Sequence, residues 1–332
     1  MPGTPRIVTT KTPLRITFAG GGTDFPEYFN NYGNGATVSA TINRYIYVTV
    51  AQNFYKDEIR ISYSKTENAL KSVNQIEHPT VREAMRMLGI KSGIQVVSIT
   101  EIPSGGTGLG SSSAFLVGLL NALHTWIGET VSPNQLAEEA VKIERNVLGE
   151  PGGWQDQYSA AFGGLNLFEF KKNNRVFVRK HLMTAEEAHD LEDRVLMFYT
   201  GKERKSSSIH KTQIIQIKEK ENHYEKMREF AMESFDYILK GEFQKLGEIL
   251  DKNWQLKKQL SSGITDKKID EWYNAAVHAG AYGGKLLGAG GGGFLMFLCD
   301  PDKKSDISRS LRTLMHEDLK IEPFGSRIVY LE

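Results

Sequence analysis

Apolar and polar residues alternate along the first third of the chain in the manner of β-strands. The alternation covers residues 6–18, 36–51 and 59–63. Helical spacing predicts a helix over 80–89, and a further apolar run predicts a strand over 93–102. The N-terminal third is therefore expected to consist largely of β-sheet.

From residue 112 onward the apolar positions recur mainly at helical spacing. Residues 112–127 place their apolar side chains on one face, and Ser132 and Pro133 form a start signal for a helix over 133–148. Beyond a hairpin-like stretch over 163–181, we expect helices within 203–240 and 242–260 and over 266–280, then a glycine loop, a strand over 293–299, a helix over 303–318 and a strand over 326–331. This order predicts an α+β fold.

Length and charge narrow the function classes. The chain has 332 residues, enough for about two domains, and a net charge of +1, so its charge gives no reason to expect nucleic acid as a partner. The longest apolar stretch, over 114–120, is far shorter than the roughly 20 residues that cross a bilayer, and no apolar signal core stands at the N-terminus. The single cysteine, Cys299, excludes an internal disulfide. We expect a cytoplasmic protein without a membrane partner.

Of the 32 glycines, 18 gather in five short segments between hydrophobic runs. These segments are 20–22, 105–110, 152–153, 163–164 and 283–293. Each could be a hairpin turn or a bulge, but several such clusters together favour tight loops that approach a ligand.

The segment PSGGTGLGSSSA, residues 103–114, lies between a predicted strand and a predicted helix. Glycines there let backbone amides converge, and a helix N-terminus adds partial positive charge, which indicates an anion site. It is not a P-loop, because no lysine follows the second glycine. Three consecutive hydroxyls could bind phosphate oxygens and supply one ligand to Mg²⁺. The alternative is a serine-rich helix cap. The candidate ATP-binding residues are Pro103, Gly105, Gly106, Gly108, Leu109, Gly110, Ser111, Ser112 and Ser113.

This segment resembles the second motif, PxxxGLGSSxA, of the GHMP kinases, the family of galactokinase, homoserine kinase, mevalonate kinase and phosphomevalonate kinase. Their first and third motifs are matched by TPLRITFAGGGTD at 12–24 and KLLGAGGGGF at 285–294. The resemblance implies an ATP-dependent phosphotransferase with an alcohol acceptor. It also implies a two-lobed α+β fold: an N-terminal GHMP kinase domain over 1–185, with a left-handed crossover, and a ferredoxin-like C-terminal domain with extra helices over 186–332. The site would lie between the lobes.

Within the family, three segments look most similar to the D-glycero-D-manno-heptose 7-phosphate kinases. They are PLRITFAGGGTDFPEYF, ATINRYIYV and FYTG with a following arginine. Those kinases phosphorylate the anomeric C1 hydroxyl and give a 1,7-bisphosphate on the way to GDP-heptose and surface polysaccharide. The same segments also resemble the kinase part of fucose-salvage enzymes, so the sugar stays open.

The resemblance assigns catalytic roles to Asp156 and Arg15. Asp156 matches the family aspartate that follows a glycine pair, and its carboxylate could accept the proton of the sugar hydroxyl. The alternative is an aspartate that stabilises a loop. Arg15 matches the cation that faces this aspartate, and we expect the two to pair. The alternative for Arg15 is a solvated charge on an edge strand.

The remaining roles concern sugar and metal. Asp24 matches the aspartate that holds sugar hydroxyls in galactokinase-like relatives, unless it caps a short helix at 26–30. The family's Mg²⁺ ligands map to Ser112 and Glu144, although Glu138 and Glu139 lie on the same predicted helix.

The candidate substrate-binding residues are Gly21, Gly22, Thr23, Asp24, Gly153, Arg204, Lys285, Gly290 and Gly291. Arg44, Arg60 and Lys202 are further candidates for a sugar phosphate.

The expected partners are a small-molecule sugar phosphate and ATP with Mg²⁺. Alternatives are a fucose- or galactose-type sugar 1-kinase, a mevalonate- or homoserine-type kinase, a nucleotide or sugar sensor of the same fold, and a structural subunit. Retention of both Arg15 and Asp156 argues against the sensor. The sequence does not determine the oligomeric state.

Overall fold

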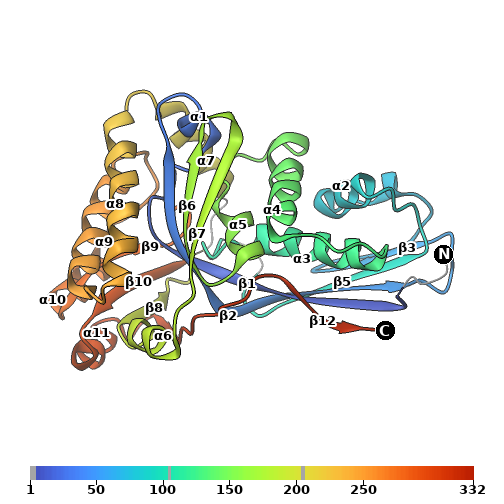
Figure 1. Cartoon of the computed structure of the whole chain (residues 1–332). Coiled ribbons are helices and arrows are strands. Elements are labelled where there is room, and N and C mark those ends of the chain that lie inside the picture. Colours follow the sequence, from blue (N-terminus) through green and yellow to red (C-terminus); the bar gives the residue numbers. More distant parts are fainter. Residues whose placement is uncertain (1–4, 104–105, 203–205) are drawn as a thin grey trace.

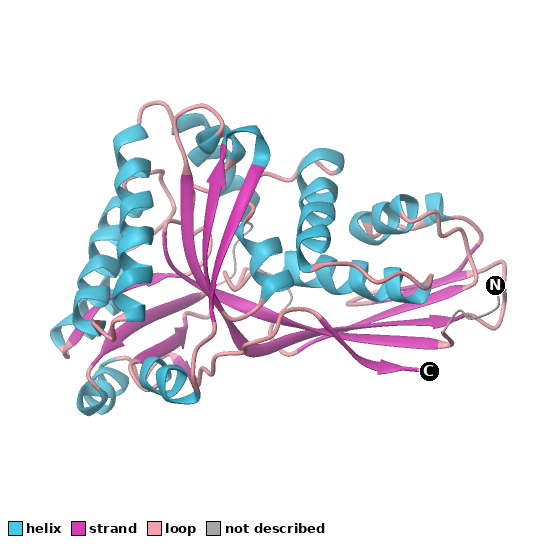
Figure 2. Ribbon diagram, in the orientation of Figure 1, coloured by secondary structure: helices cyan, strands magenta, loops and turns pink. Residues whose placement is uncertain are grey.

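The computed structural model describes residues 5–103, 106–202 and 206–332. These residues form two β-sheets with helices packed against both sides of the larger sheet, as Figures 1 and 2 show. The strands of the larger sheet are β1 (Ile7–Ala19), β2 (Gly35–Gln52), β3 (Ile59–Ser62), β4 (Thr66–Leu70), β5 (Ile94–Thr100), β6 (Leu165–Lys171), β7 (Arg175–His181) and β12 (Arg327–Leu331). The smaller sheet has the order β11 (Met315–Glu317), β8 (Val195–Tyr199), β10 (Phe294–Cys299), β9 (Ala281–Leu286).

The helices follow the chain in two groups. The first group contains α1 (Pro26–Phe29), α2 (Pro79–Met87), α3 (Ser111–Trp126), α4 (Pro133–Val141) and α5 (Gln155–Phe162). The second contains α6 (Ala185–Glu192), α7 (Ser206–Gln216), α8 (Glu221–Leu239), α9 (Phe243–Lys258), α10 (Lys267–His278) and α11 (Lys304–Ser310). None of the helices formed by the described residues combines the length and the apolar character needed to cross a bilayer.

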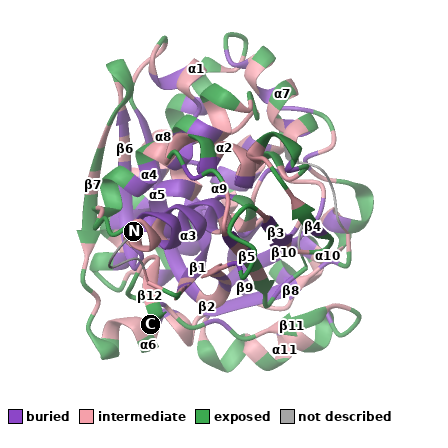
Figure 3. Ribbon diagram, turned by 90° about the vertical axis from the view of Figure 1, so that its right-hand side faces the viewer, coloured by how far each residue is buried: buried purple, intermediate pink, exposed green. Residues whose placement is uncertain are grey.

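The central strand β1 changes character halfway along its length. Its first residues alternate between buried and partly exposed, whereas every residue from Thr12 to Ala19 is buried. The second half is covered on both faces, because α3 and α5 pack on it as well as α8 and α9. Figure 3 shows α3 as the buried element at the centre of the molecule. A polar side chain in this half of β1 is therefore held away from bulk water.

The long strand β2 joins the parts of the larger sheet. It pairs with β1 along most of its length, with β6 through residues 35–40 and with β5 through residues 46–52. The predicted strand over 326–331 is found as β12, which returns to pair antiparallel with β1 (Figure 1). Both ends of the described chain therefore meet in one sheet.

Three predicted segments differ from the structure. The helix expected over 133–148 changes at residue 142 into a π-helical turn, Lys142–Val147, which is a common feature of functional sites. The helix expected over 303–318 ends at Ser310, because residues 315–317 pair with the open edge of β8 instead. The glycines expected to form a loop directly after residue 280 partly belong to β9, where Gly283 packs against the backbone of Gly247 in α9. Strands β4 and β8 and helices α5 and α6 were not predicted.

His124 connects helices α3 and α4 through contacts with two carboxylates. Its ring lies on α3 with 2% of the side chain exposed, and its two nitrogens are each 2.7 Å from a carboxylate, Glu129 on one side and Glu139 of α4 on the other. Burial acts to lower the pKa of His124, but the hydrogen bonds and charges of these two carboxylates outweigh burial and raise it. The protonated ring therefore stabilises the α3–α4 contact.

We expect His124→Gln to lower the free energy of unfolding by about 2 kcal/mol at pH 6. A group with a raised pKa contributes stability fully below its unfolded pKa and loses it as the pH rises through its folded pKa. The deficit relative to the wild type should therefore shrink between pH 6 and pH 9, measured by urea denaturation. His278→Gln, on the exposed face of α10, serves as the control. A constant deficit for His124→Gln would contradict this account.

Candidate active site

The three glycine-containing motifs meet around one cavity of about 690 Å³. Arg15 and Asp24 come from β1 and the loop after it, residues 106–113 come from the loop before α3 and its first turn, and residues 285–290 come from the end of β9 and the loop after it. Helices α5, α7 and α9 complete the wall with residues that include Asp156, His210 and Lys257. Such a concave, mostly polar site fits a small charged ligand.

The second and third motifs touch through their backbones. Gly108 and Gly288 both have positive φ angles, +77° and +69°, and face each other so closely that a Cβ on either would overlap the other loop. Gly293 likewise packs against the carbonyl of Thr107. Only glycine permits this approach. It joins two segments that are about 180 residues apart in the sequence and closes one side of the cavity.

The loop before α3 offers backbone amides to the cavity. Gly110 is the N-cap of α3 with φ +76°, and no side chain among the described residues caps that end. Ser111, Ser112 and Ser113 all line the cavity. The 16-residue helix therefore points unsatisfied amides and its positive dipole end at the space where an anion would lie. This arrangement supports the predicted phosphate site.

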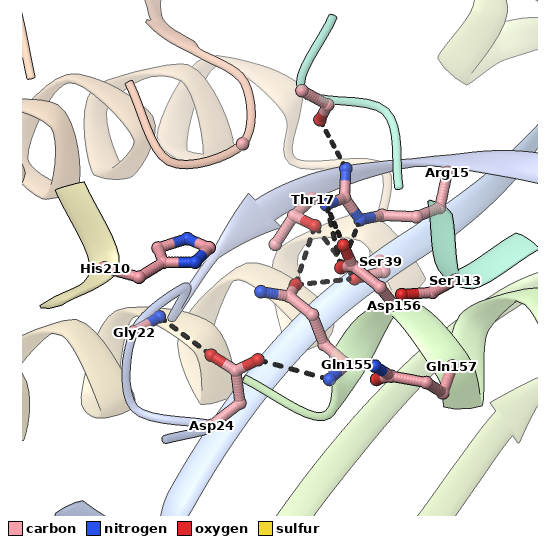
Figure 4. A network of polar contacts seen from close by, with 12 residues as sticks. Arg15, Thr17, Gly22, Asp24, Ser39, Ser113, Gln155, Asp156, Gln157 and His210 are labelled. Carbon is pink, nitrogen blue, oxygen red and sulfur yellow. Dashed lines mark hydrogen bonds and ion pairs between the residues drawn. The ribbon is translucent and has the colours of Figure 1, made fainter. Parts of the chain in front are cut away.

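Arg15 and Asp156, which both line the cavity, form an ion pair with two hydrogen bonds (Figure 4). The Arg15 Nε donates to Asp156 Oδ1 and Nη2 donates to Oδ2, both at 2.8 Å, while Nη1 donates to the carbonyl of Gly108 at 2.5 Å. The Arg15 side chain is 6% exposed and that of Asp156 is 26% exposed. The predicted pairing is thus confirmed, and the solvated edge-strand alternative for Arg15 is excluded. Asp156 lies in the first turn of α5, not in a loop.

Asp24 lies beside this pair and is almost completely buried. Its Oδ1 accepts from the amide of Gly22 at 2.8 Å and its Oδ2 from the amide of Gln155 at 3.1 Å. Any Cβ at residue 153 would overlap the carboxylate, which explains why Gly153 stands there. Burial raises the pKa of Asp24, with the two amides acting in the opposite direction. Asp24 does not cap α1, because the N-cap position belongs to Phe25.

Gln155 connects the strand to the helix that carries Asp156. Its Oε1 accepts from Thr17 Oγ1 at 2.7 Å, and Thr17 lies two residues beyond Arg15 on the same face of β1 (Figure 4). Neither residue was predicted as part of the site. The sequence holds a weak signal for them, since the alternation along β1 places residue 17 on the face of residue 15.

Glu144 reaches the cavity from the π-helical turn. Ser113 Oγ donates to its Oε2 at 2.8 Å and the Gln157 amide contacts the same oxygen, whereas Ser112 is exposed and is not bonded to Glu144. Burial raises the pKa of Glu144 to about 7, and the nearby charge of Asp156 acts in the same direction. Glu144 has no ion-pair partner in the described part of the chain. The structure therefore brings Ser113, one residue after the predicted serine, to this glutamate.

Two lysines face the cavity. Lys285 is buried in β9, where its Nζ donates to the carbonyls of Thr17 at 2.9 Å and Phe18 at 3.1 Å, and burial lowers its pKa well below the usual value. Lys257, on α9, was not predicted. Its Nζ donates to the carbonyl of Gly288, and burial lowers its pKa to about 8. In the sequence Lys257 is one of many lysines of an amphipathic helix, so no local signal distinguishes it.

His210, on α7, also lines the cavity and was also not predicted. Its Nδ1 lies 3.0 Å from the carbonyl of Pro151, and its ring meets Phe25 edge-on at 5.5 Å between centroids. Burial lowers the pKa of His210 to about 4, so the ring is neutral near pH 7. A neutral ring that donates from Nδ1 leaves Nε2 as an acceptor.

The other predicted residues differ in where they lie. Gly21, Gly22, Gly106 and Gly290 line the cavity. Pro103 is exposed outside it, and Leu109, Thr23 and Gly291 serve the fold: Leu109 is in the core, the Thr23 hydroxyl donates to the carbonyls of Gly20 and Ala36, and the Gly291 amide donates to Ile264. Gly105 and Arg204 lie outside the described residues. Arg44, Arg60 and Lys202 do not line the cavity, and Arg44 and Lys202 pair with Glu317 and Asp266.

Comparison with known proteins finds matches along most of the chain. The family model described as GHMP kinases N terminal domain matches residues 74–164, and that described as GHMP kinases C terminal matches residues 234–317. The chain is 31% identical over 322 residues to a D-glycero-alpha-D-manno-heptose 7-phosphate kinase of Campylobacter jejuni, covering 92% of this chain and 94% of that protein. It is 27% identical over 346 residues to a galactokinase of Pyrococcus furiosus, covering 92% of each.

Solved structures extend the likeness to the fold. The structure of a D-glycero-D-manno-heptose 1-phosphate kinase from Bacteroides thetaiotaomicron superposes with a TM-score of 0.80 at 27% identity, covering 98% of this chain and 99% of that one. A putative sugar kinase from Campylobacter jejuni gives a TM-score of 0.74 at 29% identity, covering 99% of this chain and 100% of that one. The family models, the relatives and the shared architecture show that this chain belongs to the GHMP kinases, a family of ATP-dependent kinases.

Proposed function

We propose that this chain transfers the γ-phosphoryl group of ATP to the anomeric C1 hydroxyl of D-glycero-D-manno-heptose 7-phosphate, giving the 1,7-bisphosphate. The observation that carries the proposal is the Arg15–Asp156 pair, which lies between the amides at the start of α3 and the buried carboxylate of Asp24. The relatives support the choice of sugar, because a heptose 7-phosphate kinase and a heptose 1-phosphate kinase are among them. The product would serve GDP-heptose and surface polysaccharide synthesis.

In this proposal the amides of residues 106–113 hold the phosphates of ATP. Asp156 accepts the proton of the anomeric hydroxyl. The oxygen of that hydroxyl forms a bond to the γ-phosphorus, and the bond between the γ-phosphorus and the bridging oxygen of ADP breaks. Arg15 keeps the Asp156 carboxylate in place with two hydrogen bonds and remains charged throughout. Asp24 accepts hydrogen bonds from other sugar hydroxyls, with Gly21, Gly22 and Gly153 leaving room for the ring.

The donor set also fits Mg²⁺. Glu144 has a carboxylate that burial makes costly to ionise and that a cation would stabilise, and hydroxyls of the second motif lie beside it. No three His, Cys, Asp or Glu side chains in the described ranges group together as a metal site. The ion would therefore take Glu144, a serine at position 112 or 113, phosphate oxygens and water as ligands. When bound, it would neutralise phosphate charge.

The preference for a sugar acceptor tests this proposal. ADP release with ATP and Mg²⁺ should be fastest with D-glycero-D-manno-heptose 7-phosphate in a panel that also contains the unphosphorylated heptose, mannose 6-phosphate, L-fucose, galactose and mevalonate. Asp156→Asn should lower kcat roughly 10³-fold, because it removes the proton acceptor while keeping the shape of the side chain. Preference for L-fucose or galactose would reassign the sugar and keep the reaction. Nucleotide binding without turnover of any acceptor would favour a sensor.

The dependence of activity on Mg²⁺ distinguishes the roles of Ser112 and Ser113. Glu144→Gln should raise the Mg²⁺ concentration needed for half-maximal activity by about 10-fold or more, because the amide carries no charge for the cation. Ser113→Ala should raise it more than Ser112→Ala, since only Ser113 contacts Glu144. The measurement is a Mg²⁺ titration of initial rates at saturating ATP. A larger effect of Ser112→Ala would return the metal role to Ser112.

A further inference from the structure

The cationic side chains that line the cavity differ in how many of their N–H groups already have a partner in the protein. Arg15 is paired with Asp156, and Arg145 is paired with Glu27 at 2.8 Å. Lys285 gives two of its three N–H groups to backbone carbonyls of β1. Lys257 bonds only to the carbonyl of Gly288, and the described part of the chain provides it with no carboxylate within ion-pair distance. Two of its N–H groups are therefore available in a buried position.

Lys257 adjoins the two glycine loops that border the cavity. Its Nζ holds the carbonyl of Gly288, and Gly288 packs directly on Gly108. The carbonyl of Gly108 accepts from Arg15, whose other nitrogens hold Asp156. A short chain of contacts thus leads from Lys257 through both glycine loops to the expected proton acceptor.

We propose that Lys257 is a catalytic residue whose ammonium group contacts the γ-phosphoryl oxygens of ATP and stabilises the negative charge on them during transfer. This deepens the proposed function and rests on it. The ammonium keeps its protons throughout, because the hydroxyl proton goes to Asp156, the new bond forms between the acceptor oxygen and the γ-phosphorus, and ADP leaves with the electrons of the broken bond. Lys257 comes from α9, in the second half of the chain, and lines the same cavity as the first residues of α3.

The charges around Lys257 suit this role. Burial and the charge of Arg15 of β1 disfavour its charged form, whereas Asp24, after β1, and Asp156 of α5 favour it. Lys285 of β9 is a further cation nearby, and Lys257 disfavours the charged form of Lys285. Burial has the largest effect on Lys257, and together these groups bring its pKa to about 8. The amine is thus mostly protonated at pH 7 and only weakly solvated, which strengthens its attraction to a phosphate.

The test compares Lys257→Met and Lys257→Arg with Lys252→Met, an exposed lysine on the same helix. Isothermal titration with Mg²⁺ and either ADP or the non-hydrolysable ATP analogue AMP-PNP isolates the γ-phosphoryl contact. For Lys257→Met we expect about 10-fold weaker binding of AMP-PNP with ADP binding within about threefold of wild type. kcat/KM for ATP should fall about 100-fold, with KM for the sugar phosphate nearly unchanged. Thermal melts should show that all variants are folded.

The pH profile supplies a second readout. In the wild type, kcat/KM for ATP should fall as the pH rises above about 8, because Lys257 loses its proton. Lys257→Arg should retain at least about a tenth of the activity and lose this alkaline limb, since the guanidinium stays protonated. A residue that only supports the loop through Gly288 would not create such a limb.

Several outcomes would overturn the inference. They are an equal loss of ADP and AMP-PNP affinity, an effect confined to KM for the sugar phosphate, a loss matched by Lys252→Met, or an alkaline limb that persists in Lys257→Arg. If the wild type phosphorylates none of the acceptors, the proposed function fails, yet the comparison of ADP with AMP-PNP still decides whether Lys257 contacts the γ-phosphoryl group.

Discussion

The site depends on the ion pair between Arg15 and Asp156. Arg15 lies in the half of β1 that helices cover on both faces, so its charge must be matched inside the protein. Asp156 provides that match with two hydrogen bonds, and the Gly108 carbonyl takes a third. Removing one member of a buried pair costs about 3–5 kcal/mol, because the other charge is left uncompensated. The pair therefore holds β1, the second motif and α5 in one arrangement.

Close backbone approach provides the second constraint. Gly108 and Gly288 pack so tightly that no other residue fits either position, and Gly153 leaves space for the carboxylate of Asp24. These glycines allow amides and acidic side chains to surround one small volume. The glycine clusters of the sequence thus serve contacts between distant segments more than local turns, and in β9 they serve helix packing.

Burial perturbs the charged groups that line this volume. It raises the pKa values of Asp24 and Glu144 and lowers those of Lys257 and Lys285. Such opposite shifts in one cavity are typical of sites that handle charged substrates. A phosphate would stabilise the lysines and a cation would stabilise Glu144, so a nucleotide and a metal ion would relieve the cost of burial on both sides.

The sequence by itself determined the elements with strong periodicity and the segments that carry the motifs. Strands β1 and β2 and helix α3 were predicted close to their observed bounds, because hydrophobic alternation and spacing are local properties. The pairing of Arg15 with Asp156 was expected from family resemblance. The tertiary structure alone decided that Ser113 meets Glu144, that Lys257 and His210 enter the cavity, and that residues 315–317 leave a helix to pair with β8. Each of these depends on partners distant in the chain, and contacts of that kind leave no periodic or compositional trace in the sequence around either partner.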